Sequence, residues 1–289
     1  MTYMILDREI NIPEHQKFKG IKLIDVCVAA IHSEAENTKC YKLRRADNGL
    51  LPSVEPGAHV DVHLPNGIVR QYSLLSARRR PQLYSIGVKR DEMSRGGSRY
   101  IHETLQVGAR LRISEPRNNF PLHEKAKHSV FIAGGIGITP IWCMLNRLNM
   151  IGRSWQLFYS CRSARQAIFF DRLKRFPQVK FHFDDKNSGQ FLDLTEIIRT
   201  TPSYAHVYCC GPGPMMAAFE LATAGWKADQ VHVEYFSPKQ QTKVETSFIV
   251  ELARSGRVVT IPGDKSILAA LQDAGFNLAY SCEQGICGT

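Results

Sequence analysis

The chain has 289 residues, of which 44% are hydrophobic and 22% charged, and this composition is typical of a soluble globular protein with two or three domains. The formal net charge of +10 suggests nucleic-acid binding, but the basic residues are dispersed and no basic helix or zinc pattern accompanies them, so a basic face for an acidic protein partner is the better interpretation. No apolar run reaches the roughly 18 residues of a membrane helix, and the N-terminus lacks a secretory signal, so we expect a cytoplasmic protein with neither nucleic acid nor membrane as a partner.

The first part of the chain alternates apolar and polar residues in short runs separated by turns. This pattern predicts a six-stranded antiparallel β-barrel over residues 17–120, interrupted by one short helix at 99–105. The expected strands cover residues 21–26, 40–44, 59–64, 67–74, 83–89 and 109–113.

One of these strands carries a permanent cation, an aromatic hydroxyl and a small hydroxyl in Arg70, Tyr72 and Ser73. Arg70 offers donors to anionic oxygens, Tyr72 a ring face, and Ser73 a short hydrogen bond. These groups suit a flat ring with a phosphate tail. The structural alternative is an ordinary edge strand whose arginine lies along the surface.

Gly96, Gly97 and Ser98 precede the short helix. Backbone N–H groups at the start of a helix, together with the positive end of its dipole, are typical of a phosphate seat. A flexible loop with Ser98 as N-cap is the structural alternative.

Strands and helices then alternate over residues 121–236, for example a helix expected at 167–176 and a strand at 179–183, and this alternation predicts a parallel α/β sheet with helices on both faces. Two glycine turns, 134–140 and 211–214, follow strands in this region. Ligands of such sheets bind at the carboxyl ends of strands, so the turns predict a nucleotide site. We expect Thr139 to cap the following helix and Pro140 to occupy its first helical position.

The last part reads as a linker at 237–245 followed by a small domain over 246–289, with a hairpin at 248–261 and a helix at 266–274. Cys282 and Cys287 have the C-x4-C spacing of a plant-type ferredoxin, whose third cysteine would fall at position 290. We expect a truncated [2Fe–2S] domain with an incomplete ligand set. The other six cysteines are expected to be buried thiols.

Taken together, these motifs resemble the phthalate dioxygenase reductase-like proteins, flavin and iron–sulfur reductases that serve Rieske oxygenases. The motifs that carry the resemblance are Arg70-Gln71-Tyr72-Ser73-Leu74, Gly87-Val88-Lys89-Arg90, Arg95-Gly96-Gly97-Ser98, residues 134–140, Cys209-Cys210-Gly211-Pro212, Glu234-Tyr235-Phe236 and residues 282–289.

The resemblance implies a role for each matching residue. The flavin would be held by Arg70, Gln71, Tyr72, Ser73, Val88, Lys89, Gly96, Gly97 and Ser98. The nicotinamide nucleotide would be held by Gly135, Gly137, Thr139, Pro140, Arg162, Arg165, Cys210, Gly211 and Pro212. Ser73, Cys210 and Phe236 would lie at the reacting rings, and Cys282 and Cys287 would bind the cluster.

The implied function is the reductase component of an oxygenase system, which takes hydride from NADH to FMN and passes single electrons through a [2Fe–2S] cluster to a Rieske-type oxygenase. The compact phosphate seat favours FMN over FAD, and Arg162 with Arg165 leaves NADPH open beside NADH. A stand-alone NAD(P)H flavin or ferric reductase and a redox sensor are the alternative functions.

Overall fold

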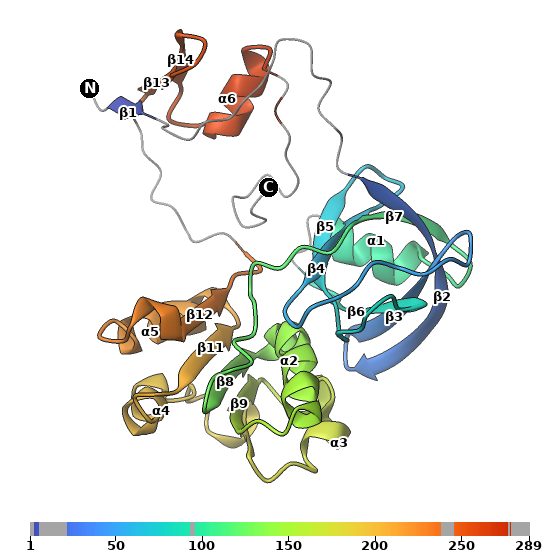
Figure 1. The fold of residues 1–289 in the computed structure, drawn as a ribbon, viewed down its shortest axis with the longest axis vertical. Coiled ribbons are helices and arrows are strands. Elements are labelled where there is room, and N and C mark those ends of the chain that lie inside the picture. The colour runs from blue at the N-terminus through green and yellow to red at the C-terminus, as the bar shows by residue number, and fades with distance from the viewer. Residues whose placement is uncertain (1–2, 6–21, 93–95, 238–245, 277, 279–289) are drawn as a thin grey trace.

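The computed structural model describes residues 3–5, 22–92, 96–237, 246–276 and 278. Three β-sheets are present in these ranges, and they follow one another along the chain apart from one short N-terminal strand (Figure 1). None of the helices in the described ranges is long and apolar enough to cross a bilayer.

The first sheet is antiparallel with six strands in the order β5-β4-β7-β2-β3-β6, which confirms the predicted architecture. Its strands are β2 (Leu23–Ala35), β3 (Thr38–Arg45), β4 (His59–His63), β5 (Val69–Ser73), β6 (Leu83–Lys89) and β7 (Arg110–Ser114), with helix α1 (Gly97–Thr104) inserted between β6 and β7. Alternate side chains such as Val26, Leu43, Val60 and Ile113 are fully buried and form the barrel core.

The two edge strands of this sheet, β5 and β6, meet only briefly. Leu74 and Ile86 form an isolated bridge, and the Leu75 N–H donates to the Ser85 carbonyl at 2.9 Å. Continued pairing would bring Ser73 opposite Gly87, but no such pair is present among the described residues. The barrel therefore opens between β5 and β6, where both edges have backbone groups available for a ligand.

The second sheet is parallel with five strands in the order β10-β9-β8-β11-β12, again as predicted. Helices α2 and α3 cover one face of it and α4 and α5 the other (Figure 1). The elements are β8 (Ser129–Gly134), η1 (Gly135–Gly137), α2 (Ile138–Met150), β9 (Trp155–Cys161), η2 (Ala164–Gln166), α3 (Phe170–Leu173), β10 (Val179–Phe183), η3 (Asp184–Lys186), α4 (Leu194–Thr200), β11 (His206–Cys210), α5 (Gly213–Ala222), η4 (Ala228–Gln230) and β12 (Val231–Glu234).

Two local predictions in this region are wrong. Thr139 does not cap α2 and Pro140 is its third residue, not its first, because the 3-10 turn η1 runs directly into the helix and Gly137 is the N-cap. The helix expected over 167–176 shrinks to α3, because Phe169 adopts a left-handed conformation with φ of 62° and is buried in the core.

The third sheet has the order β1-β13-β14 and packs against α6 (Ile267–Asp273). The hairpin β13 (Phe248–Leu252) and β14 (Arg257–Ile261) is where the sequence places it. Strand β1 (Tyr3–Ile5), which the sequence analysis did not anticipate, pairs in parallel with β13. Ser266 caps α6 by accepting a hydrogen bond from the Ala269 N–H at 3.1 Å.

Candidate cofactor-binding site

The start of α1 lies directly against the side chain of Arg70. A Cβ atom added to Gly97 would lie 2.7 Å from Cγ and 3.0 Å from Nε of Arg70, so only glycine allows this approach. Gly96, the N-cap, has φ of 93° and turns the chain into the helix. The Ser98 hydroxyl accepts a hydrogen bond from the Asp91 N–H at 3.2 Å and so ties the preceding loop to the helix. A guanidinium group and a helix N-terminus thus converge, which is the arrangement that binds a phosphate.

Ser73 lies beside the opening between β5 and β6. Its side chain is only 4% exposed, and its Oγ has no hydrogen-bond partner in the part of the chain that the structure describes. A buried hydroxyl without a partner is costly unless a ligand completes it. Tyr72, the preceding residue, packs against the barrel core, and burial raises the pKa of its hydroxyl. These residues fit the ring of a flavin at this edge.

The side chains of Gln71 and Val88, unlike the Ser73 hydroxyl, already have partners within the protein. The Gln71 amide donates to Oδ1 of Asp61 at 3.1 Å and so belongs to a polar cluster with Asp61 and Arg117, on the face of β4 and β5 opposite the core residues Val60 and Val62. Val88 is fully buried in the core, and its carbonyl accepts a hydrogen bond from Nε2 of His102 at 2.8 Å. Only the backbones of these two residues can face a cofactor, whereas Lys89, which is half-buried, ends β6.

The two glycine turns of the α/β sheet pack against each other at the carboxyl ends of β8 and β11. A Cβ atom on Gly137 would lie 2.0 Å from the carbonyl oxygen of Cys210, and one on Gly134 would lie 3.1 Å from Cα of Gly211 and 2.5 Å from Cδ of Pro212. Gly135 has φ of 53°, and its carbonyl accepts a hydrogen bond from the Tyr159 hydroxyl at 3.1 Å. This close approach opens the backbone toward a pyrophosphate at the start of α2.

Thr139 joins the two candidate sites. It is buried in the first turn of α2 beside Pro140, and its hydroxyl donates to the Ile136 carbonyl at 2.9 Å. Its Cγ2 atom lies 3.0 Å from where a Cβ of Gly87 would stand. Gly87 belongs to the edge strand β6, as do Val88 and Lys89. The start of α2, at the candidate nucleotide site, therefore contacts the strand that borders the candidate flavin site.

Cys210 ends β11 and is fully buried beside Glu234, which ends the neighbouring strand β12. Burial, and then the nearby Glu234 carboxylate, raises the pKa of the Cys210 thiol well above its usual range. Burial likewise raises the pKa of Glu234 from 4.5 to about 8, and its Oε2 has no partner among the described residues. Burial of its carboxyl thus favours the neutral form of Glu234, which the sequence analysis included in a motif but did not treat as a site residue.

The remaining predicted residues lie at the same end of the parallel sheet. Arg162 and Arg165 are exposed, just after β9, and Pro212 caps α5 after the second glycine turn. Phe236 lies two residues beyond the end of β12 and is 39% exposed. Cys282 and Cys287 lie outside the described residues.

Comparisons with known proteins agree with this arrangement. Residues 250–289 match the family model of the 2Fe-2S iron-sulfur cluster binding domain. The chain is 45% identical over 267 residues to a phenoxybenzoate dioxygenase subunit beta of Ectopseudomonas oleovorans, an alignment that covers 92% of this chain and 83% of the relative. It is 43% identical over 274 residues to a vanillate O-demethylase oxidoreductase of a Pseudomonas species, with 92% and 86% covered.

Among solved structures, that of phthalate dioxygenase reductase superposes with a TM-score of 0.75 at 36% identity, covering 92% of this chain and 84% of that one. The chain belongs to the phthalate dioxygenase reductase-like family. As a member of that family it is an oxidoreductase, the reductase component of an oxygenase system.

In this phthalate dioxygenase reductase-like protein, the structure brings Arg70 and Gly97 together beside the edge strand β5, which ends at Ser73, and brings the two glycine turns together at one end of the parallel sheet. Sequence reasoning missed Gly87 and Glu234 as site residues. The signal for Glu234 was present, because a carboxylate that ends a strand next to that of Cys210 must lie at the same edge of a parallel sheet.

Proposed function

We propose that this reductase takes hydride from NADH to FMN and delivers single electrons through a [2Fe–2S] cluster to a Rieske-type oxygenase. When bound, these cofactors supply the hydride acceptance and the change from two-electron to one-electron transfer. The observation that supports the proposal best is the contact between Gly87 and Thr139. Gly87 lies in β6, which borders the proposed flavin site, and Thr139 lies at the start of α2, in the proposed nucleotide site.

The flavin half of the proposal assigns a task to each residue at the barrel opening. Arg70 and the N–H groups at Gly97 and Ser98 hold the phosphate, and Ser73 donates its unpaired hydroxyl to a ring heteroatom. Gln71, Val88 and Lys89 border the cofactor mainly through their backbones, and Tyr72 supports the ring.

The nucleotide half assigns the pyrophosphate to the glycine turns and the adenosine end to Arg162 and Arg165. Cys210 and Glu234 line the nicotinamide side without carrying charge, since burial raises the pKa of both groups. Phe236, at the end of the adjoining segment, covers the flavin when the nicotinamide is absent. We propose the same domain division as the sequence suggests, at 17–120, 121–236, a linker at 237–245 and 246–289.

Reconstitution tests the proposal. The purified protein, loaded with FMN and cluster, is mixed with a purified Rieske-type demethylase and NADH, and product formation is measured. We expect NADH-dependent turnover. If NADH reduces the flavin but the oxygenase stays oxidised, while a cytochrome P450 accepts the electrons, the assignment to a Rieske-type partner is wrong.

A further inference from the structure

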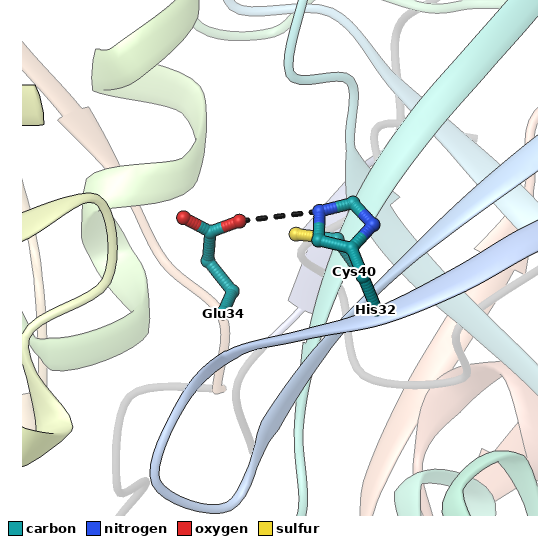
Figure 2. Close-up of side chains that lie close together, drawn as sticks. All are labelled: His32, Glu34 and Cys40. Carbon is teal, nitrogen blue, oxygen red and sulfur yellow. Dashed lines mark hydrogen bonds and ion pairs between the residues drawn. The ribbon is translucent and has the colours of Figure 1, made fainter.

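Three side chains with different donor atoms converge on the hairpin of β2 and β3. His32 and Cys40 are direct cross-strand partners, and Glu34 lies at a register shift between Ser33 and Ala35. Nε2 of His32 is 3.2 Å from Oε2 of Glu34, and one ligand atom from each of the three residues lies within 4.8 Å of the others. Figure 2 shows the imidazole, the carboxylate and the sulfur pointing toward one another.

The burial of these groups suits a bound ion that is reached from one side. Cys40 is 1% exposed and the Glu34 side chain 9% exposed, whereas the His32 side chain is 47% exposed and leaves a path from solvent. Neither His32 nor Cys40 belongs to the flavin or nucleotide residues described above. The cluster thus uses side chains that bind neither proposed cofactor, although Cys40 is the cross-strand partner of Gly87.

We propose that His32, Glu34 and Cys40 form a binding site for a zinc ion. Imidazole nitrogen, carboxylate oxygen and thiolate sulfur are the usual zinc ligands, with metal distances of about 2.0 to 2.3 Å. Tetrahedral coordination then separates the ligand atoms by about 3.3 to 3.7 Å. The His32–Glu34 distance of 3.2 Å already fits, and small side-chain rotations close the rest. A water molecule on the His32 side completes the fourth position.

Zinc binding changes two bonds at this site. The Sγ–H bond of Cys40 breaks, the Sγ–Zn bond forms, and the proton leaves to solvent without any transfer of electrons. The charge of Glu34 is also shared with a cation, because its Oε2 faces His32 while its Oε1 forms an ion pair with Arg172 of α3, whose guanidinium lies 4.6 Å from the ring centroid of Phe169. Zinc therefore competes with Arg172 for the Glu34 carboxylate.

The competition for Glu34 takes place at the contact between the barrel and the α/β domain. The same hairpin touches the α/β sheet where the Glu36 N–H donates to the Arg165 carbonyl at 2.9 Å. Zinc at Oε2 of Glu34 weakens the ion pair that Oε1 makes between the barrel and α3, because both cations draw on one carboxylate charge.

Calorimetric titration of the cofactor-loaded protein with Zn²⁺, in buffers of different ionisation enthalpy, tests the site. The wild type should bind one more zinc ion than His32→Ala, or bind it at least about 10-fold more tightly, with release of about one proton. His128→Ala removes a half-buried histidine just before β8, away from this cluster, and should bind zinc like the wild type. Any zinc bound by Cys282 and Cys287 is also bound by His32→Ala, so the titration of this variant is subtracted from that of the wild type.

Two further variants sharpen the test. Cys40→Ser should abolish the proton release and the sulfur signal of this ion in zinc X-ray absorption. Arg172→Gln should strengthen zinc binding several-fold, because it removes the competing cation. Equal zinc binding by the wild type and His32→Ala, or weaker binding by Arg172→Gln, would overturn the proposal.

Discussion

Ser73 and Glu234 contribute two of the few buried polar side-chain atoms that lack a hydrogen-bond partner in the described part of the chain. Each such atom costs about 1 to 3 kcal/mol of folding free energy, so folded proteins keep few of them without a reason. Both atoms lie where the two proposed cofactor sites begin. The unfavourable burial is therefore explained if ligands complete these groups.

Replacing Ser73 with Ala should weaken flavin binding without destabilising the apoprotein. The loss of one hydrogen bond to the ring corresponds to about a 10-fold higher Kd, while removal of an unpaired hydroxyl leaves the free energy of unfolding unchanged or raises it by about 1 kcal/mol. Flavin fluorescence titration and denaturant unfolding of the apoprotein measure the two quantities.

Ser114→Ala is the matched control. The Ser114 hydroxyl accepts from the Asp61 N–H and donates to the Glu115 carbonyl, both at 2.9 Å, so this variant should lose about 1 to 3 kcal/mol of stability and keep its flavin affinity. A Ser73→Ala variant that retains full flavin affinity contradicts the assignment.

Glu234 makes stability depend on pH in a defined direction. Its folded-state pKa of about 8 lies above its ordinary value of 4.5, so the folded protein binds the extra proton. The contribution of this group to the free energy of unfolding is fully present below pH 4.5 and is lost as the pH rises through about 8. Glu234→Gln should therefore raise Tm at the alkaline end and flatten Tm against pH, whereas Asp185→Asn, at an exposed carboxylate, should leave the profile of the wild type. An unchanged slope in Glu234→Gln means that the carboxyl is solvated.

At the scale of elements, the two glycine turns hold β8, α2 and β11 at distances that no other residue permits. Gly137 has the tightest contact of the two turns, since a Cβ atom added there would lie 2.0 Å from the Cys210 carbonyl oxygen, while Gly213 at the start of α5 has nothing within 4 Å. Backbone atoms cannot move aside as a flexible side chain can. The turns thus fix the geometry of the nucleotide site through backbone contact.

Gly137→Ala should cost about 3 kcal/mol of stability or more and weaken NADH binding, because α2 must move away from β11. Gly213→Ala should change stability by less than about 0.5 kcal/mol, since it meets open space in the first turn of a helix. Urea unfolding compares the two variants. Equal stability of both would show that α2 relaxes without cost.

Periodicity in the sequence is sufficient to predict both large sheets, since strands such as β6 and β10 have the predicted bounds. It fails where packing decides local structure. Thr139 carries a capping side chain, yet the fit of Gly137 against Cys210 starts the helix earlier. Strand β1 depends on a partner more than 240 residues away, which no local pattern records. Gln71 and Ser73 lie on the same face of β5, but Gln71 is opposite Asp61 and its amide binds that carboxylate, while the Ser73 hydroxyl, opposite His59, has no partner among the described residues.

At the scale of the whole molecule, the barrel and the α/β sheet share a core. Leu75 and Phe120 of the barrel side pack in one cluster with Met144 of α2, and Gly57 lies so close to the Phe120 carbonyl that a Cβ would stand 1.9 Å from it. The region matched by the cluster-binding family model has its own small core around Val250 and Ile261. Flavin reduction and cluster reduction therefore depend on different parts of the chain.

Cys282→Ser should separate these two steps. We expect NADH-driven reduction of the flavin at the wild-type rate, together with loss of electron transfer to cytochrome c or another one-electron protein acceptor, because only the cluster ligand is removed. Stopped-flow absorbance follows the first step and acceptor reduction the second. Loss of both activities together would show that the cluster region supports the flavin site.

The contact between Gly87 and Thr139 also bears on the kinetics of the enzyme. The two regions already touch through the backbone of Gly87 and the buried methyl group of Thr139, so we expect no domain closure before hydride transfer, only the departure of the Phe236 ring from the flavin. We expect the rate of flavin reduction to be independent of solvent viscosity, as measured with added sucrose or glycerol. An enzyme whose domains had to close around the nucleotide would show slower flavin reduction as solvent viscosity increases.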